Sequence, residues 1–246
     1  MTHLHIPDGV IPAFWLVTGF ALTGIILALA LYKTRGEESG RRLPRLGVVA
    51  GVMLLVMSVP LGFLPVHLNL AVLAGIILGP WLAFIATFLV NMFLALVGHG
   101  GITALGLNSL ILGLEAMLGG WFFRGLARKM PLVPAAAGAT AIAMLLSLSL
   151  LVGLMTALDI HPLLPGEHRH GVGLEGREES TTVLEHHGYH LPAGRSKVSW
   201  QRFLALVLPL GLLGAFLEAT AVALVVAFLA RVRPDILSPG RAGGRS

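Results

Sequence analysis

The sequence predicts an all-α membrane protein, a bundle of about seven transmembrane helices with its N-terminus outside and a short third helix. Composition is the first observation, because 56% of the residues are hydrophobic and 12% are charged, against about a quarter charged in soluble domains. The mean hydropathy of +0.86 is the second. The third is a series of apolar runs. We expect one transmembrane domain over 1–232, including an external His-rich loop at 159–199, and a disordered cytoplasmic tail at 233–246.

Each run is compared with the ~20 apolar residues that cross a bilayer. Six runs come close to that length or exceed it, at 12–32, 46–64, 81–97, 102–123, 133–157 and 200–230. The run at 68–79 is shorter, since its residues reach about 18 Å at 1.5 Å each, against a hydrocarbon core of about 30 Å. It ends at Gly79-Pro80. We therefore expect a half-length, recessed third helix that leaves room on one side of the bundle.

Charge sets the predicted orientation. With the N-terminus outside, twelve of the 17 Lys and Arg residues fall on the cytoplasmic side and five outside, all five in or beside the loop at 159–199. This bias follows the positive-inside rule. All ten histidines then fall outside. A pI near 10.4 is thus explained by a lipid bilayer rather than by nucleic acid, and we expect a multi-pass protein of the cell membrane.

The first nine residues are a candidate metal-binding segment. They carry His3, His5, an α-amine and Asp8, and they contain no Lys or Arg. Imidazole and amine nitrogens suit nickel, cobalt, copper and zinc. The chain has no Cys, so a metal needs nitrogen or oxygen ligands. The segment is too polar to span a membrane and lacks the basic start and apolar run of a signal peptide.

Two further histidines are candidates for the same site. His67 lies between a span and the short helix, at membrane depth, where a polar side chain is costly without a partner. The room beside the short helix would let His3 or His5 meet it. His99, in a Gly-rich turn, is either a supporting donor or a solvated turn residue. The histidines of the 159–199 loop either collect metal loosely or are simply solvated.

Two acidic residues lie inside predicted spans. Glu115 and Glu218 each need a partner, because a bare carboxylate there costs at least ~2.5 kcal/mol on insertion scales. The sequence holds neither a Gly-x-x-x-x-Gly-Lys-Ser/Thr phosphate loop nor a Gly-x-Ser-x-Gly elbow, which are the motifs of one class of ATPase and one class of hydrolase. We therefore expect a transport subunit rather than an enzyme, with no catalytic cofactor.

Three motifs carry a family resemblance. His-Ile-Pro-Asp-Gly at 5–9, Leu-Gly-Pro-Trp at 78–81 and Gly-Gly-Ile-Thr-Ala-Leu-Gly-x-Asn at 100–108 resemble motifs of the CbiM/NikM proteins. These are the substrate-capture components of energy-coupling factor transporters for cobalt and nickel. The resemblance covers about residues 1–125. It implies Ni²⁺ or Co²⁺ as transported substrate, an inward-plugging N-terminus, and His67 as a ligand. It also implies a membrane T component, ATPase subunits and a small accessory membrane protein as partners.

The chain departs from these proteins in three places. Four residues, Met1 to Leu4, precede the family's His; the stretch at 62–66 is less Gly-rich; and His99 replaces an acidic residue. The first departure bears on the metal donors. If Met1 is kept, His3 is third in the chain, and the Met1 amine, two amides and the His3 imidazole can fill four corners without His67. If Met1 is removed, Thr2-His3 becomes the start and restores the family's set of amine, amide and imidazole, with His67 or His5 as fourth donor. Four nitrogens in a square plane favour Ni²⁺ or Cu²⁺. The alternative is a His5–His67 site.

Two other functions remain open at this point. A self-sufficient metal transporter or channel would need no ATPase, although the sequence shows no chain of charged residues across the bundle. An intramembrane metalloprotease would need a third ligand and a base near the middle of the membrane. Substituting Glu115 or Glu218 would test the second alternative.

Overall fold

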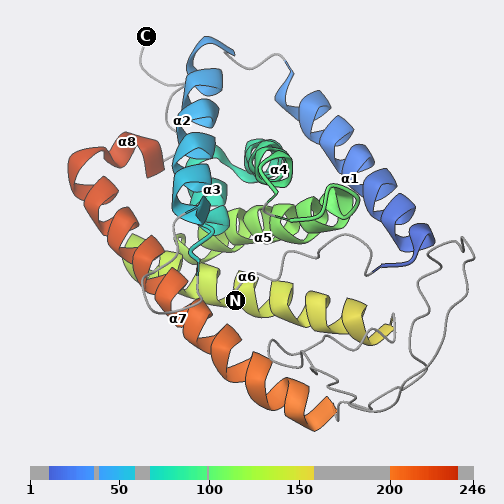
Figure 1. Ribbon diagram of the computed structural model, residues 1–246. Helices are drawn as coiled ribbons and strands as arrows, with labels where there is room; N and C mark the ends of the chain where they lie inside the picture. Colours follow the sequence, from blue (N-terminus) through green and yellow to red (C-terminus); the bar gives the residue numbers. More distant parts are fainter. Residues whose placement is uncertain (1–10, 36–38, 59–66, 99, 158–199, 238–246) are drawn as a thin grey trace, which may run out of the picture.

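The computed structural model describes residues 11–35, 39–58, 67–98, 100–157 and 200–237. These residues form a helical bundle, which confirms the predicted all-α class (Figure 1). Seven helices match the seven apolar runs, and a short eighth follows them. The helices are α1 (Ala13–Thr34), α2 (Ser39–Ser58), α3 (Ala71–Leu78), α4 (Pro80–Leu96), α5 (Leu105–Leu126), α6 (Leu132–Ala157), α7 (Trp200–Val232) and α8 (Pro234–Leu237).

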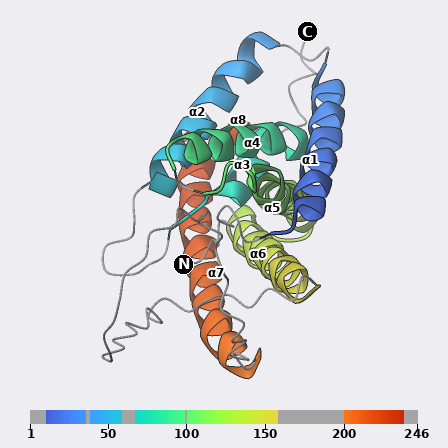
Figure 2. The ribbon, with the colours of Figure 1, turned by 45° about the vertical axis from the view of Figure 1, so that its right-hand side comes forward.

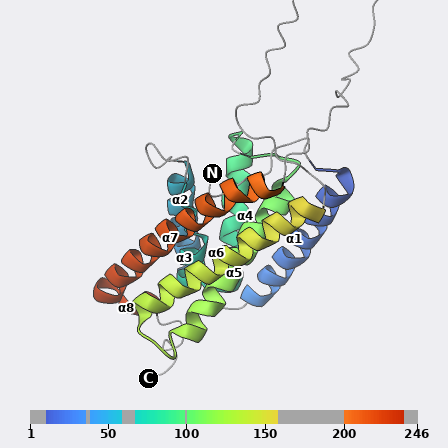
Figure 3. The same ribbon diagram turned by 90° about the horizontal axis from the view of Figure 1, so that it is seen from below.

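Helix α5 is the centre of the bundle. It packs against α1, α3, α4 and α6, while α7 packs along α6. Helix α1 lies at one edge and α7 with α8 at the opposite edge (Figure 1). In the view turned by 45°, α1 again forms one edge (Figure 2). Seen from below, α5, α6 and α7 lie in succession (Figure 3). In the most apolar stretch of each helix, 61% of α5 is buried inside the bundle, whereas 17% of α1 is. The other helices are therefore arranged around α5.

Glycines allow the neighbours of α5 to approach closely. A Cβ on Gly106 would lie 2.5 Å from the backbone nitrogen of Phe20 in α1, and one on Gly120 would lie 2.6 Å from the carbonyl oxygen of Gly75 in α3. Real Cβ atoms essentially never come that close. Lipid tails are as apolar as leucine, so helices in a membrane associate through such close packing and interhelical hydrogen bonds. The small residues therefore fix α1 and α3 against α5.

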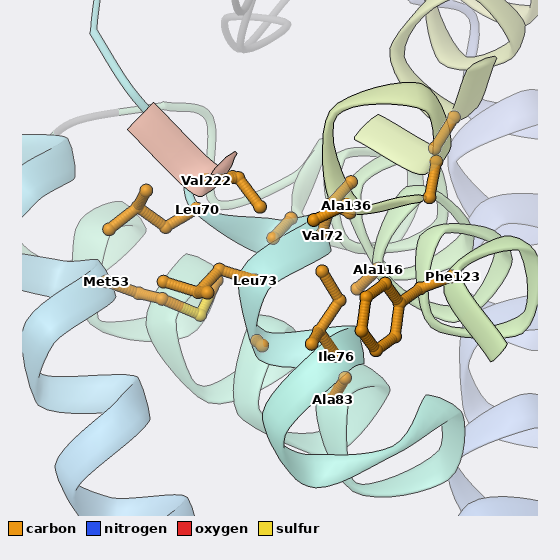
Figure 4. Packing of buried hydrophobic residues seen from close by; sticks show 14 of the residues in the cluster. Met53, Leu70, Val72, Leu73, Ile76, Ala83, Ala116, Phe123, Ala136 and Val222 are labelled. Carbon is orange, nitrogen blue, oxygen red and sulfur yellow. The ribbon is translucent and has the colours of Figure 1, made fainter. Parts of the chain in front are cut away.

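Helix α3 is short and buried, as predicted. It has eight residues, of which the first six are buried, and at 1.5 Å per residue it is about 12 Å long. Figure 4 shows its side chains between Met53 of α2 and Ala116 and Phe123 of α5. It starts at Ala71 rather than at the predicted residue 68, because the backbone of Leu70 is left-handed. The sequence Gly79-Pro80 ends it and begins α4.

Four helices of the described part of the chain are long and apolar enough to cross a membrane: α1, α5, and most of α6 and α7. The apolar parts of α2 and α4 are shorter, at 43–58 and 80–96. The outward faces of the edge helices are apolar, since Phe14 of α1 and Phe216 and Phe228 of α7 are more than 60% exposed. Such faces are what contact with lipid tails requires.

Two boundaries predicted from the sequence are wrong. The second apolar run was placed at 46–64, which leaves 33–45 as a polar connection, but α2 starts at Ser39. Arginine is a good helix former, so the helix can begin in the polar stretch ahead of the apolar run. The apolar run therefore marks where the helix becomes hydrophobic and not where it begins. Residues 233–246 were expected to be disordered, but 234–237 form α8, with Leu237 buried in the main core. Its start has Pro at the first helical position, which is a preferred place for that residue.

An ion pair marks the start of α8. Arg233 donates two hydrogen bonds to the Asp235 carboxylate, at 3.0 and 2.9 Å, and both side chains are exposed. These bonds lower the pKa of Asp235 below its ordinary value. The negative charge is also favourable in the first turn of a helix.

Candidate metal-binding site at the start of α3

His67 is the one predicted metal ligand that lies among the described residues. It is half-buried, with its Nδ1 atom shielded from solvent, and it is the first described residue before α3. Met1, Thr2, His3, His5, Asp8 and His99 lie outside the described residues, as does the predicted loop at 159–199. The donor set proposed from the sequence therefore remains a prediction, and the geometry that bears on it is that of the segment 67–70.

The backbone of this segment is held by Glu218 of α7. One carboxylate oxygen accepts a hydrogen bond from the Asn69 N–H at 3.0 Å, and the other accepts from the Leu70 N–H at 2.6 Å. Leu70 has φ 55° and ψ 20°, a left-handed conformation that costs a non-glycine residue roughly 1–2 kcal/mol. A hydrogen bond is worth about 0.5–1.5 kcal/mol net, so the two bonds to Glu218 together can hold this conformation in place.

Asn69 connects the segment to α5. Its side-chain nitrogen donates to the Glu115 carboxylate at 2.8 Å, and its side-chain oxygen accepts from the Ala71 N–H at 2.7 Å. Glu115 has a further side-chain hydrogen bond with Ser147 of α6. Asn69, Glu115 and Glu218 are all at most 1% exposed. The start of α3 is thus tied to α5 and α7 through one buried amide and two buried carboxylates.

This network supplies the partners that Glu115 and Glu218 were predicted to need. Each faces a partner, as predicted, and the partners are the Asn69 side chain, two backbone N–H groups and a hydroxyl. An unsatisfied N–H in hydrocarbon costs several kcal/mol. Glu218 satisfies the N–H groups of Asn69 and Leu70 just before α3, and the Asn69 side chain satisfies that of Ala71, the first residue of the helix.

The network lies deep in the bundle. Glu115 is ten residues after the start of α5, which is about 15 Å along the helix axis. Glu218 is eighteen residues after the start of α7 and fourteen before its end, or about 27 and 21 Å. The segment that carries His67 therefore descends to the middle of the two helices before α3 begins.

The N-terminal end of α1 packs at the start of α5. Ile11 is buried against Ala104 and Leu107, and Thr23 donates a hydrogen bond of 2.7 Å to the Gly106 carbonyl. Residues 1–10 therefore join the described chain at this end of α5. Leu107 is eight residues before Glu115, about 12 Å along the helix.

Sequence reasoning missed Asn69. A signal was present, because an Asn just ahead of an apolar run is a common start of a helix. Among the described residues, no group of three or more His, Asp or Glu side chains is placed to hold a metal ion. A metal at His67 would thus need donors from outside these residues.

The family of the chain follows from its sequence. Residues 5–236 match the family model of CbiM, described as the cobalt uptake substrate-specific transmembrane region. The chain belongs to the CbiM family. Together with its four helices of membrane-crossing length, this makes it a multi-pass membrane protein. The match extends well past residue 125, where the recognisable motifs end.

Curated CbiM relatives share about 30% identity with half of the chain. The cobalt transport protein CbiM of Sorangium cellulosum (strain So ce56) is 30% identical over 138 residues, which are 51% of this chain and 59% of that protein. The protein of the same name from Geobacter sulfurreducens is 30% identical over 137 residues, which are 51% of this chain and 38% of that protein. The alignments thus span less than two thirds of these relatives.

Solved structures show the same fold as this CbiM chain. A crystal structure described as that of a transition metal transporter superposes with a TM-score of 0.66, at 21% identity, over 93% of both chains. A truncated transition metal transporter gives 0.65 at 20% identity, over 93% of this chain and 99% of the other. The likeness therefore extends over the whole bundle.

Proposed function

We propose that this chain is the substrate-binding membrane subunit of an ATP-driven importer of Ni²⁺ or Co²⁺, of the energy-coupling factor type. The observation that carries the proposal is the position of His67. It lies ahead of a recessed eight-residue helix, and Asn69 and Leu70, which lie between them, are fixed to two neighbouring helices. Neutral imidazole is the commonest ligand for such metals. Family membership supports the proposal, since the family is described by cobalt uptake.

The remaining donors are proposed to come from the N-terminal segment. Eight residues separate His3 from Ile11, and an extended chain of that length spans at most about 26–29 Å. Ile11 packs on Leu107, about 12 Å along α5 from Glu115. His3 and His5 are therefore within reach of the depth at which His67 lies. Either His3, with the backbone nitrogens of residues 2 and 3, or His5 would meet His67 there.

The nitrogen set also bears on the metal. An amine, a deprotonated amide and two imidazoles form a square plane that favours Ni²⁺, and because these ligands lose protons, binding weakens as the pH falls. The curated relatives named above are called cobalt transport proteins. Titrating the purified chain with Ni²⁺ and with Co²⁺ decides between the two ions.

Partner subunits complete the proposed importer. ATP hydrolysis is assigned to separate ATPase subunits, and coupling to a membrane T component and a small accessory membrane protein. Uptake of metal by vesicles that contain this chain with and without those subunits tests this assignment. Uptake that needs only this chain would instead make it a self-sufficient transporter.

The central test is the affinity of the purified chain for Ni²⁺ and Co²⁺, measured by calorimetry. We expect His67→Ala to lower that affinity at least tenfold, about 1.4 kcal/mol, while the helical content stays unchanged. The matched control is the pair His186→Ala and His187→Ala in the long loop, which should have little effect. The site is wrong if the loop pair proves essential and His67 dispensable.

The same assay separates the two donor sets at the N-terminus. Intact mass shows whether Met1 is removed. If the amine and His3 bind, then N-acetylation and His3→Ala both weaken binding more than His5→Ala does. If acetylation leaves binding intact and His5→Ala abolishes it, the site is His5 with His67.

A further inference from the structure

We propose that Glu218, acting through the backbone of residues 69–70, is a positioning residue for His67, and that Asn69 and Glu115 complete this device. The inference rests on the proposed function, because it assigns a cause to the affinity of that same site. It concerns side chains that touch no metal and lie at the middle of the bundle.

The first step is the bidentate contact. Both oxygens of Glu218 are used, one for the Asn69 N–H and one for the Leu70 N–H. Paired hydrogen bonds to one carboxylate fix orientation as well as distance. Two consecutive peptide planes are therefore held against α7, and with them the left-handed turn at Leu70 that begins α3.

The second step is the short distance along the chain. His67 precedes Asn69 by two residues, which span at most about 7 Å. Asn69 is itself held at both ends of its side-chain amide, by Glu115 and by the Ala71 N–H. The backbone that follows His67 thus has little freedom, and the imidazole is presented from an anchored point rather than from a loose loop.

The third step is the choice of a carboxylate at position 218. The two N–H groups bond to different oxygens of Glu218, and a carboxamide in the same orientation replaces one of these oxygens with an NH₂ donor. In Glu218→Gln, the carboxamide NH₂ would face one of the two N–H groups, so one bond is lost. In Glu115→Gln, the carbonyl oxygen can still accept from Asn69. The same chemical change should therefore have different effects at the two positions.

The test combines these variants with His67→Ala in a double-mutant cycle, using Ni²⁺ and the full chain in detergent. Affinity is measured by calorimetry, the coordination by the visible absorption band of bound Ni²⁺, and the fold by circular dichroism. We expect Glu218→Gln to weaken Ni²⁺ binding about tenfold, within the range for residues in one network. It should change the Ni²⁺ band in the same direction as His67→Ala.

In the His67→Ala background, Glu218→Gln should weaken binding by less than about twofold, since the residue it positions is gone. Glu115→Gln keeps the acceptor for Asn69 and should weaken binding less than Glu218→Gln does, whereas Glu115→Leu should weaken binding more than Glu115→Gln. The matched control is Asn91→Leu, which removes a buried polar contact between α4 and α5, with Ser109 at 3.5 Å. It should leave the Ni²⁺ affinity unchanged.

Three outcomes would overturn the inference. One is a folded Glu218→Gln chain with wild-type affinity and spectrum. Another is that Glu218→Gln lowers the Ni²⁺ affinity by the same factor in the wild-type and His67→Ala backgrounds. The third is that Asn91→Leu lowers the Ni²⁺ affinity as much as Glu218→Gln does. If Glu218→Gln does not fold, Glu115→Leu decides by the same readouts. A wild-type chain that binds no Ni²⁺ or Co²⁺ refutes the proposed function itself, whereas metal binding that depends on His67 but not on Glu218 refutes this inference alone.

Discussion

The contact between α3 and α5 predicts a large effect of one methyl group. In Gly75→Ala, the new Cβ would lie 2.0 Å from the Ala116 carbonyl oxygen and 2.9 Å from the Gly120 nitrogen. Ordinary contact begins near 3.4 Å, so the two helices must separate by about 1.4 Å. Both contacting atoms belong to the backbone of a central helix, which cannot turn aside as a flexible side chain would.

The magnitude follows from overpacking and helix propensity. Inserting a methyl group into a well-packed core costs about 1–3 kcal/mol, and rigid backbone neighbours place this case at the upper end. Alanine is favoured over glycine in a helix by about 1 kcal/mol. We therefore expect Gly75→Ala to lower the free energy of unfolding by about 2 kcal/mol.

A second glycine-to-alanine substitution in a helix serves as a control for the helix propensity of alanine. Gly51 lies in α2, and a Cβ added there would meet nothing within 4 Å, so Gly51→Ala should be neutral or stabilising. The difference between the two variants should be about 3 kcal/mol. Unfolding of each purified variant in mixed detergent micelles, followed by circular dichroism, measures it. Equal stability of the two alanine variants would refute the role of close packing at Gly75.

Two further predictions concern α1 and the orientation of the bundle. Thr23→Val removes the hydrogen bond from α1 to the Gly106 carbonyl at nearly constant shape, and should cost about 0.5–1.5 kcal/mol in the same unfolding assay; no change would mean that packing alone holds α1. Since the chain has no Cys, single cysteines at positions 40 and 180 report the topology. An impermeant thiol reagent outside the cell should label position 180 and not position 40, and the reverse pattern would invert the bundle.

The sequence was sufficient for the architecture because the apolar runs are long and their ends are marked. The short third helix followed from the length of its run and from Gly79-Pro80. The need of Glu115 and Glu218 for partners followed from the cost of a bare carboxylate in the membrane. Both expectations are confirmed by the bundle.

The identity of those partners could not be predicted. Glu218 bonds to the N–H of a residue 149 positions away. The left-handed residue at this turn is Leu70, and it lacks the usual sequence signal for that conformation, which is a glycine. Such a contact depends on how α7 is placed against α3, which no local pattern encodes. The N-terminal donors remain a prediction for a different reason, because residues 1–10 lie outside the described part of the chain.

The contact of Glu218 with residues 69–70 also sets an order of events during synthesis. With about 12 Å of length, α3 is too short to span a bilayer, and the side chain that accepts from the Asn69 and Leu70 N–H groups just before it belongs to α7, 148 residues after Leu70. A nascent chain that ends before α7 leaves the ribosome without that acceptor. Competence to bind metal at His67 should therefore arise only once α7 has been inserted, late in biogenesis, and a chain truncated before Glu218 should not acquire it.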